Sequence, residues 1–298
     1  RRGHPGDERM SGFSSDWLSL REPADHRARS AEIAAMVEAR FATRDSLAVI
    51  DLGCGTGSNL RATSQLLPLR QSWTLVDYDR DLLAAARTTL ARWADRVEIA
   101  DHGLKLAKGR RTITVTFRQA DLAADLDAAL AGEADLVTAS ALFDLCSAPF
   151  IRRFAQAIAR KRAVFLTVLT YNGIQRFTPR HPLDQGIAQA FNAHQMRDKG
   201  FGPSAGPTAP SELADAFRAM GYLVSEGDSP WRLTAAGDGA LMSELTTGKA
   251  AAVAETGMVD AKALAAWSAV RHTGVEVGHT DTFAIPGDPS AAFTDASD

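Results

Sequence analysis

A buried strand that ends in an acid and runs into a row of glycines is the feature that most restricts this fold. Residues 48–59 read AVIDLGCGTGSN, with glycines at positions 53, 55 and 57 behind Asp51. Because glycine has no side chain, the backbone amides of such a turn can approach a bound group closely. A tight turn without a ligand is the alternative. The spacing is not the GxGxxG of dinucleotide-binding turns, because position 58 is serine.

Short apolar runs alternate with helical patterns through the first part of the chain. The expected strands are 47–52, 73–79, 112–122, 134–145 and 162–170, and the expected helices are 25–41, 60–67, 81–94 and 150–160. A hairpin-like stretch at 99–115 precedes the third strand. Strands that alternate with helices are joined by right-handed crossovers into a parallel sheet covered on both faces. The sequence therefore predicts a doubly wound α/β fold with a mostly parallel sheet.

The pattern changes after residue 171. Residues 172–210 contain many prolines and glycines around one short amphipathic segment, which indicates a cap over the strand ends. A helix at 211–221, a strand at 222–233, a helical pair within 238–271 and a last strand at 275–286 are expected to follow. We divide the chain into an N-terminal helical segment (1–44), a Rossmann-like core (45–171), a cap insertion (172–210) and the remainder of the core with a helical insertion (211–298).

Charge and cysteine content restrict the partners. The net charge of -3 offers no general attraction for nucleic acid, so a small-molecule partner is favoured. Cys54 and Cys146 are the only cysteines, which suits a reducing compartment and argues against a disulfide framework or a zinc site. No run of eighteen apolar residues appears, and the start of the sequence lacks the apolar segment of a secretory signal. We expect a cytoplasmic protein without a membrane partner.

A second acid strengthens the interpretation of the glycine turn. Asp77 ends the second expected strand twenty residues after Gly57 (77 minus 57), where a carboxylate can bind both hydroxyls of a ribose. With VIDLGCGTG, Asp77 and RQADL in this order, residues 45–170 resemble the class I S-adenosylmethionine-dependent methyltransferases. The resemblance implies a seven-stranded sheet, S-adenosylmethionine as cofactor, methyltransferase activity, and an N-terminal segment that folds over the cofactor.

The same resemblance assigns roles to single residues around the methionine part of the cofactor. Asp51 and the backbone of the glycine turn would face the methionine, and Arg21 is a candidate partner for its carboxylate. The alternative for Arg21 is a surface position beside a docked leading helix. The cofactor-binding residues that the resemblance implies are Arg21, Asp51, Gly53, Gly55, Thr56, Gly57, Asn59, Asp77, Tyr78, Asp121, Leu122, Ser140, Ala141 and Leu142.

At the adenosine end, the resemblance places Asp77 on the ribose hydroxyls and Tyr78 on the adenine ring. Asp121 would bond the adenine amino group, and Leu122 would lie against the ring. Residues 140–142, at the end of the fourth expected strand, would form the floor beneath the sulfonium.

The acceptor should lie where the fourth and fifth strands end, beneath the cap. Asp144 lies at the end of the fourth expected strand and is a candidate for polarising or binding the acceptor; the alternative is an acid that caps the loop after the strand, which is common. Tyr171 and Asn172 directly follow the fifth strand, at the expected rim of the site. His272, His279 and Asp281 are interpreted as structural, and Trp231 and Trp267 as part of the core or cap packing.

The densest polar cluster is AFNAHQMRDKGFG, within the insertion. If residues 187–199 are helical, Asp198 lies one turn from His194, where it could orient the imidazole of a general base. A half-buried histidine with a helix-end ion pair is the alternative. The candidate catalytic residues are thus His194, Asp144 and Tyr171, and the candidate substrate residues are Asn172, Asn192, Gln195, Asp198 and Lys199.

The resemblance implies a methyltransferase, and the charge pattern favours a small-molecule acceptor to which the methyl group passes by in-line displacement. The insertion carries four cations (Arg176, Arg180, Arg197 and Lys199) against two acids (Asp184 and Asp198), which favours an anionic acceptor. Methyl transfer from a sulfonium needs no metal, and no metal-ligand spacing is seen. An RNA or protein methyltransferase and a noncatalytic binding protein with the cofactor fold are the alternatives.

Overall fold

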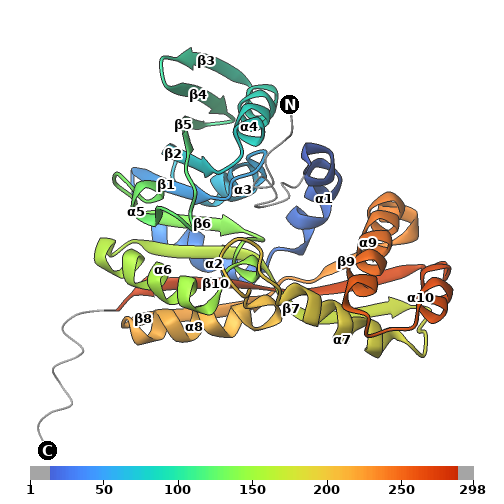
Figure 1. Ribbon diagram of the computed structural model, residues 1–298. Coiled ribbons are helices and arrows are strands. Elements are labelled where there is room, and N and C mark those ends of the chain that lie inside the picture. The colour runs from blue at the N-terminus through green and yellow to red at the C-terminus, as the bar shows by residue number, and fades with distance from the viewer. Residues whose placement is uncertain (1–13, 288–298) are drawn as a thin grey trace, which may run out of the picture.

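The computed structural model describes residues 14–287. Within them a ten-stranded sheet has the order β3-β4-β5-β2-β1-β6-β7-β10-β8, and β9 pairs with β10 (Figure 1). The strands are β1 (Ser46–Leu52), β2 (Arg70–Asp77), β3 (Arg96–Ala100), β4 (Gly103–Lys108), β5 (Arg111–Gln119), β6 (Leu136–Ser140), β7 (Val164–Thr178), β8 (Tyr222–Asp228), β9 (Trp231–Thr234) and β10 (Gly274–Pro286). Those parts of the predicted segments 1–44 and 211–298 that fall in 1–13 and 288–298 lie outside the described residues.

The centre of the sheet is parallel. β1 pairs in parallel with β2 and β6, β2 with β5, and β6 with β7, whereas β10 runs antiparallel between β7 and β8. The series β5-β2-β1-β6-β7-β10-β8 contains the seven strands that the resemblance implied. The antiparallel β3 and β4 and the short β9 are additions to it. The prediction of a doubly wound, mostly parallel α/β fold is confirmed, with more strands than expected.

Helices cover both faces of this sheet because its central strands are apolar on both sides. On β1, Leu47 and Val49 pack toward α2 (Ala31–Phe41), α3 (Ser58–Thr63) and α4 (Arg80–Trp93). Ile50 and Leu52 belong to the opposite core, with α5 (Leu126–Ala129), α6 (Ala148–Lys161) and α8 (Ala209–Ala219). The continuous apolar run of this strand therefore reflects burial on both faces.

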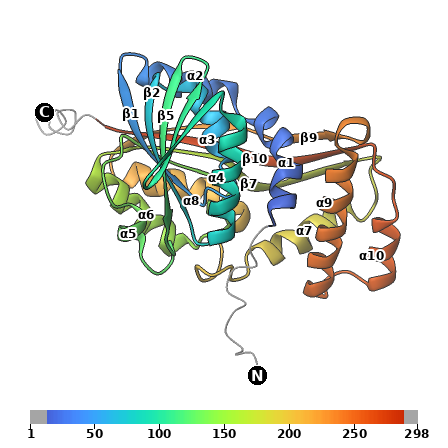
Figure 2. The same cartoon turned by 90° about the horizontal axis from the view of Figure 1, so that it is seen from above.

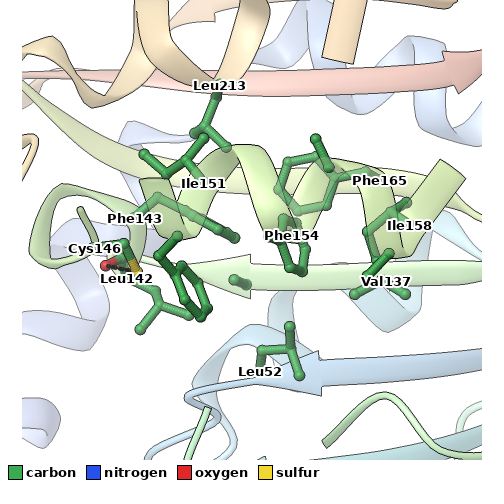
Figure 3. Close-up of a cluster of buried hydrophobic side chains, with 14 of the residues drawn as sticks. Leu52, Val137, Leu142, Phe143, Cys146, Ile151, Phe154, Ile158, Phe165 and Leu213 are labelled. Carbon is green, nitrogen blue, oxygen red and sulfur yellow. Dashed lines mark hydrogen bonds between the residues drawn. The ribbon is translucent and has the colours of Figure 1, made fainter. Parts of the chain in front are cut away.

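The core on the α6 side is rich in aromatic rings, and Figure 3 shows part of it. Phe143 and Phe154 have ring centroids 4.9 Å apart, and Phe165 stacks on Phe217 at 4.6 Å. Ser147 begins α6 by accepting a hydrogen bond from the Phe150 backbone N–H. This core fixes the position at which β6 ends and η2 (Phe143–Leu145) begins.

The cap extends the sheet sideways. It consists of α7 (Asp184–Gln195), β9, α9 (Ala235–Thr256), α10 (Ala261–Ser268) and the outer parts of β7 and β10, and it has its own apolar core. Figure 2 shows α1 (Ser15–Ala28) between the covered sheet and this cap. The fifth strand was expected to end at residue 170, but β7 continues to Thr178 because β10 pairs with it over its outer half.

Other elements also differ from the predicted ones. The fourth strand, expected at 134–145, ends at Ser140 and is followed by η2. The helix expected at 25–41 is broken at Arg29, because the Ser30 side chain caps a new helix by accepting from the Ile33 backbone N–H. The strand expected at 222–233 is divided into β8 and β9, which both pair with β10. Across residues 14–287, no helix combines the length and apolar character needed to cross a bilayer.

Candidate functional site

The glycine turn joins β1 to α3 and is shaped as a backbone cradle. Gly53, Gly55 and Gly57 have φ of 61°, 52° and 79°, the left-handed region that favours glycine. A Cβ placed on Gly55 would lie 3.0 Å from Leu18 Cδ1, and one on Gly53 would lie 3.3 Å from Leu142 Cδ1. The backbone conformation therefore favours glycine at these positions, and a side chain at Gly53 or Gly55 would also crowd a leucine methyl group. Such a turn fits the close approach of a cofactor.

Asp77 lies beside this turn at the end of β2. Its Oδ2 accepts the Gly55 backbone N–H at 2.9 Å, and its Oδ1 accepts the Asp79 backbone N–H at 3.0 Å. Burial raises the pKa of this carboxyl, and the two backbone donors act against that rise. The neighbouring Tyr78 is 46% exposed, so part of its side chain is accessible. Asp77, the acid expected to bind the ribose, is therefore hydrogen-bonded to the glycine turn.

Asp51 is fully buried beneath the turn. Its Oδ1 accepts from Asn59 Nδ2 at 2.7 Å, whereas its Oδ2 has no hydrogen-bond partner among residues 14–287. Burial raises the pKa of Asp51 to about 7. The Asn59 amide also donates to Thr138, and its oxygen accepts from Arg29 and Thr63. All hydrogen-bonding positions of Asn59 are thus filled by protein groups, so we expect it to hold Asp51 rather than touch the cofactor.

The remaining predicted cofactor residues follow β5 and β6. Asp121 is exposed and accepts from the backbone N–H groups of Ala123 and Ala124 at 2.9 and 3.2 Å, while Leu122 is buried beside it. Ala141 has φ of 51°, a strained conformation for alanine, directly before Leu142. Thr56 is buried within the turn, where its carbonyl oxygen accepts from Arg61 at 2.8 Å.

A second strained residue lies next to the end of β6. Leu169 has φ of 60°, and the backbone N–H of Ala141 donates to the carbonyl of Val168. Asp281 of β10 accepts the Leu169 backbone N–H at 2.8 Å and the Ser30 backbone N–H at 2.9 Å. One buried carboxylate therefore ties β7 to the start of α2. Strained residues thus lie side by side at the end of β6 and within the neighbouring β7, and such strain is typical of functional sites.

Asp144 lies just beyond this point, in η2. Its Oδ1 is buried and accepts no hydrogen bond from any described residue. Burial raises the pKa of Asp144 to about 6, although the charge of Arg21 and the backbone N–H of Tyr171 lower it. The carboxylate is thus close to Tyr171, the other candidate catalytic residue. Tyr171 and Asn172 were expected to follow the fifth strand, but both lie within β7 because β10 pairs with this part of the chain.

Tyr171 takes part in a chain of hydrogen bonds that enters the cap. Its hydroxyl donates to Asn192 Oδ1 at 2.7 Å and accepts from Gln175 Nε2. Gln175 Oε1 in turn accepts from the buried Lys249. The predicted substrate residue Asn192 is therefore joined to the predicted catalytic Tyr171. Asn172 instead donates to Thr280 Oγ1 of the neighbouring strand at 3.3 Å.

The predicted pair of His194 and Asp198 does not form. α7 ends at Gln195, and Asp198 lies in the following loop, where it accepts the backbone N–H groups of Gly200 and Gly202. His194 Nε2 contacts Glu255 Oε2 of α9 at 3.0 Å, and Arg197 binds the same oxygen. The acid that orients His194 is therefore distant in sequence. Gln195 and Lys199 are half-buried at and beyond the end of the helix.

Arg21 is neither a surface residue nor an isolated cation. Its guanidinium forms a double hydrogen bond with Asp25 at 2.9 and 3.1 Å and lies 5.0 Å from the ring centroid of Trp231. Trp231 and His279, which were interpreted as structural, lie at the same place, with ring centroids 5.3 Å apart. No local pattern indicated these neighbours, because β9, β10 and α1 meet only in the folded chain.

A groove of about 500 Å³ lies behind α3, away from Asp144. Glu22 and His26 of α1 line it together with Arg61. His26 contacts Ser58 Oγ at 2.9 Å, and burial together with the charge of Arg29 lowers the pKa of His26. The groove therefore lies at the contact between α1 and α3, outside the candidate site.

Comparison with solved structures supports the same fold. No protein-family model and no curated protein matches the sequence. A candidate methyltransferase from Bacillus halodurans superposes with a TM-score of 0.52 and 12% identity, covering 87% of this chain and 100% of its own. The YcgJ protein of Bacillus subtilis superposes with a TM-score of 0.50 and 14% identity, over 86% of this chain and 99% of its own. The chain thus has the fold of the class I S-adenosylmethionine-dependent methyltransferases, as its motifs implied.

Proposed function

We propose that the protein is an S-adenosylmethionine-dependent methyltransferase that acts on a small-molecule acceptor. The observation that carries the proposal is the left-handed glycine turn with the Asp77 carboxylate hydrogen-bonded to Gly55, at the carboxyl edge of a sheet with this fold. In open α/β sheets this edge is where ligands bind. Asp77 would hold the ribose, and Asp51 with the turn would hold the methionine part.

The bound cofactor supplies an activated methyl group, and the protein aligns the acceptor with it. In-line displacement requires the acceptor atom to be held close to the methyl carbon while water is kept away. α1 helps to keep water away, because Leu18 lies on the glycine turn at Gly55. The residues of η2 and β7, Asp144 and Tyr171, are placed to contact the acceptor.

A small molecule fits this arrangement better than a macromolecule. α1 and the cap flank the strand ends, and the net charge of -3 does not favour a nucleic-acid backbone (Figure 2). The charge argument for an anionic acceptor loses its support, because Arg176 and Arg197 are paired with Glu276 and Glu255. His194 shares Glu255 with Arg197, so we assign it to joining α7 with α9 rather than to proton removal.

Calorimetric titration with S-adenosylmethionine, S-adenosylhomocysteine and NAD tests the cofactor assignment. We expect the first two to bind and NAD to give no heat. Asp77→Ala removes two acceptor oxygens that carry charge, so binding should weaken roughly 10- to 100-fold, given about 1.5–3 kcal/mol for a hydrogen bond to a charged group.

Asp101→Ala, an exposed acid in the turn between β3 and β4, is the matched control and should bind like the unmodified protein. Tight binding of NAD, or unchanged affinity of the Asp77 variant for S-adenosylmethionine, would contradict the proposal.

A further inference from the structure

Five side chains from five elements lie together beyond β6, where Asp144 is close to Arg21 and Tyr171. They are Arg21 of α1, Asp144 of η2, Tyr171 of β7, Trp231 of β9 and His279 of β10, and we call them the Asp144 cluster. Arg21 lies over the Trp231 ring at 5.0 Å, and the His279 ring lies 5.3 Å from Trp231 and 6.3 Å from Tyr171. The cluster adds three residues to those expected near the acceptor: Trp231 and His279, which were interpreted as structural, and Arg21, which was expected at the cofactor.

Two polar atoms of the cluster have no hydrogen-bond partner within residues 14–287. They are Asp144 Oδ1 and His279 Nδ1, both buried, and His279 is only 6% exposed. Buried polar atoms are normally hydrogen-bonded, and leaving one unsatisfied costs about 1–3 kcal/mol. Two such atoms near the same arginine indicate a place built to receive a polar group.

The charges of the cluster leave one carboxylate unbalanced. Arg21 is paired with Asp25 by a double hydrogen bond, and Asp25 also accepts from Trp231 Nε1 at 2.9 Å. Burial lowers the pKa of His279 to about 3, so its imidazole is neutral at physiological pH. The remaining charge is that of Asp144. A carboxylate that lacks donors on one oxygen favours a ligand that brings N–H groups and positive charge.

We propose that the Asp144 cluster holds an amine acceptor, with Asp144 Oδ1 accepting a hydrogen bond from the amine and taking the proton that its nitrogen loses. The position fits transfer, because Asp144 follows Leu142, whose side chain packs against Gly53 of the cofactor turn. This inference deepens the proposed function and rests on it.

The step balances with these groups. The free amine nitrogen forms a bond to the methyl carbon while the carbon–sulfur bond breaks, and the electron pair of that bond stays on sulfur. The methylated nitrogen then carries a positive charge and gives one proton to the Asp144 carboxylate, which later releases it to solvent. No oxidant, reductant or metal is needed.

Carbon-13 spectra of protein labelled at its aspartate carboxyl carbons test the inference without knowledge of the natural acceptor. Methylammonium chloride is titrated into the protein saturated with S-adenosylhomocysteine, and sodium acetate is titrated in parallel at matched ionic strength. We expect methylammonium to shift the Asp144 resonance with half-saturation on the order of 10 mM, the range for a ligand of two non-hydrogen atoms. Acetate should leave the resonance unchanged.

Asp144→Asn assigns the resonance, and Asp144→Glu, which keeps the charge but removes the label, assigns it if the first variant does not fold. The Asp101 resonance should not move. A shift with acetate, or no saturable shift with methylammonium while S-adenosylhomocysteine binds, overturns the amine site and leaves the proposed function intact. Failure of S-adenosylhomocysteine to bind overturns both.

Discussion

The carboxyl groups of the site differ in what already contacts them. Asp77 receives two backbone N–H groups, Asp51 receives one amide from Asn59, and Asp144 keeps one buried oxygen without a partner. Burial raises the pKa of each of them. The same residue type thus occupies three electrostatic environments within one site, and the least satisfied of the three lies where we place the acceptor.

Arg21 provides a test of the geometry around Asp144. Arg21→Met keeps the length of the side chain but removes its charge, one of the influences that lower the pKa of Asp144. We expect the titration midpoint of the Asp144 carboxyl, about 6 in the unmodified protein, to rise in this variant. Carbon-13 titration of the labelled carboxyl measures it. Arg21→Lys, which keeps the charge, is the control, and equal midpoints for Arg21→Met and the unmodified protein would place Arg21 too far away.

Site residues that lie close to one another in the sequence could be predicted, whereas those brought together from distant parts of the chain could not. The glycine turn and Asp77 follow their strands directly, so local pattern and family resemblance located them together. Trp231 and His279 reach the site through β9 and β10, and their register with β7 is set by pairing that no local pattern records. Arg21 was singled out, but its partner Asp25 and its position over Trp231 were not.

At the level of elements, α1 contacts the glycine turn and α3, which follow β1, at several points along its length. Leu18 lies on Gly55, the Glu22 carboxylate is paired with Arg61, and His26 contacts Ser58. The cofactor turn and its cover are therefore coupled, and a change in one should alter the cost of a change in the other.

Gly55→Ala measures this coupling. It should destabilise the protein for two reasons: the left-handed backbone, which costs an alanine about 1–2 kcal/mol, and the contact of the new methyl group with Leu18. Leu18→Ala removes the second cause, so the double variant should lose less stability than the sum of the single losses. Urea unfolding of the four proteins checks this. Strict additivity would mean that α1 does not rest on the turn.

The order and type of the elements were predictable, and their limits were not. Residues 172–178 were assigned to a cap because Gly173 and the prolines beyond it suggest a loop, but β10 supplies the hydrogen bonds that make them a strand. The break near Ser30 has a local signal, a serine that caps a helix, within a pattern that otherwise favours one continuous helix. Long-range strand pairing and helix capping thus determine where strands and helices begin and end, which the hydrophobic periodicity of the sequence does not show.

At the scale of the whole molecule, the cap has a polar residue within its core. Lys249 of α9 is 2% exposed, lies over the rings of Phe177 and Phe191 at 5.0 and 4.8 Å, and donates to Gln175. Burial lowers the pKa of Lys249 to about 7, and the charge of Asp184 opposes this. Lysine side chains are mostly exposed in folded proteins, so the burial of Lys249 could not be predicted from the sequence.

This lysine should make the stability of the protein depend on pH. Above its lowered pKa the folded chain has lost a proton that the unfolded chain retains up to pH 10.5, the ordinary value. The free energy of unfolding should therefore rise with pH in this window, with a contribution of up to about 1.4 kcal/mol per pH unit. Lys249→Met should remove that contribution, and urea unfolding between about pH 7 and 10 compares the slopes.

Lys262→Met, an exposed lysine of α10, is the control and should keep the slope of the unmodified protein. Equal slopes for Lys249→Met and the unmodified protein would mean that Lys249 remains protonated in the folded state.

The position of β10 in the chain has a consequence for synthesis. β7, β8 and β9 all pair with this strand, which spans Gly274–Pro286 and follows every other described element. While the ribosome is still translating, the strands from β1 to β6 can associate, but the outer edge of β7 and both later strands lack their common neighbour. The cap and the acceptor side of the molecule must therefore assemble after nearly all of these residues have emerged from the exit tunnel.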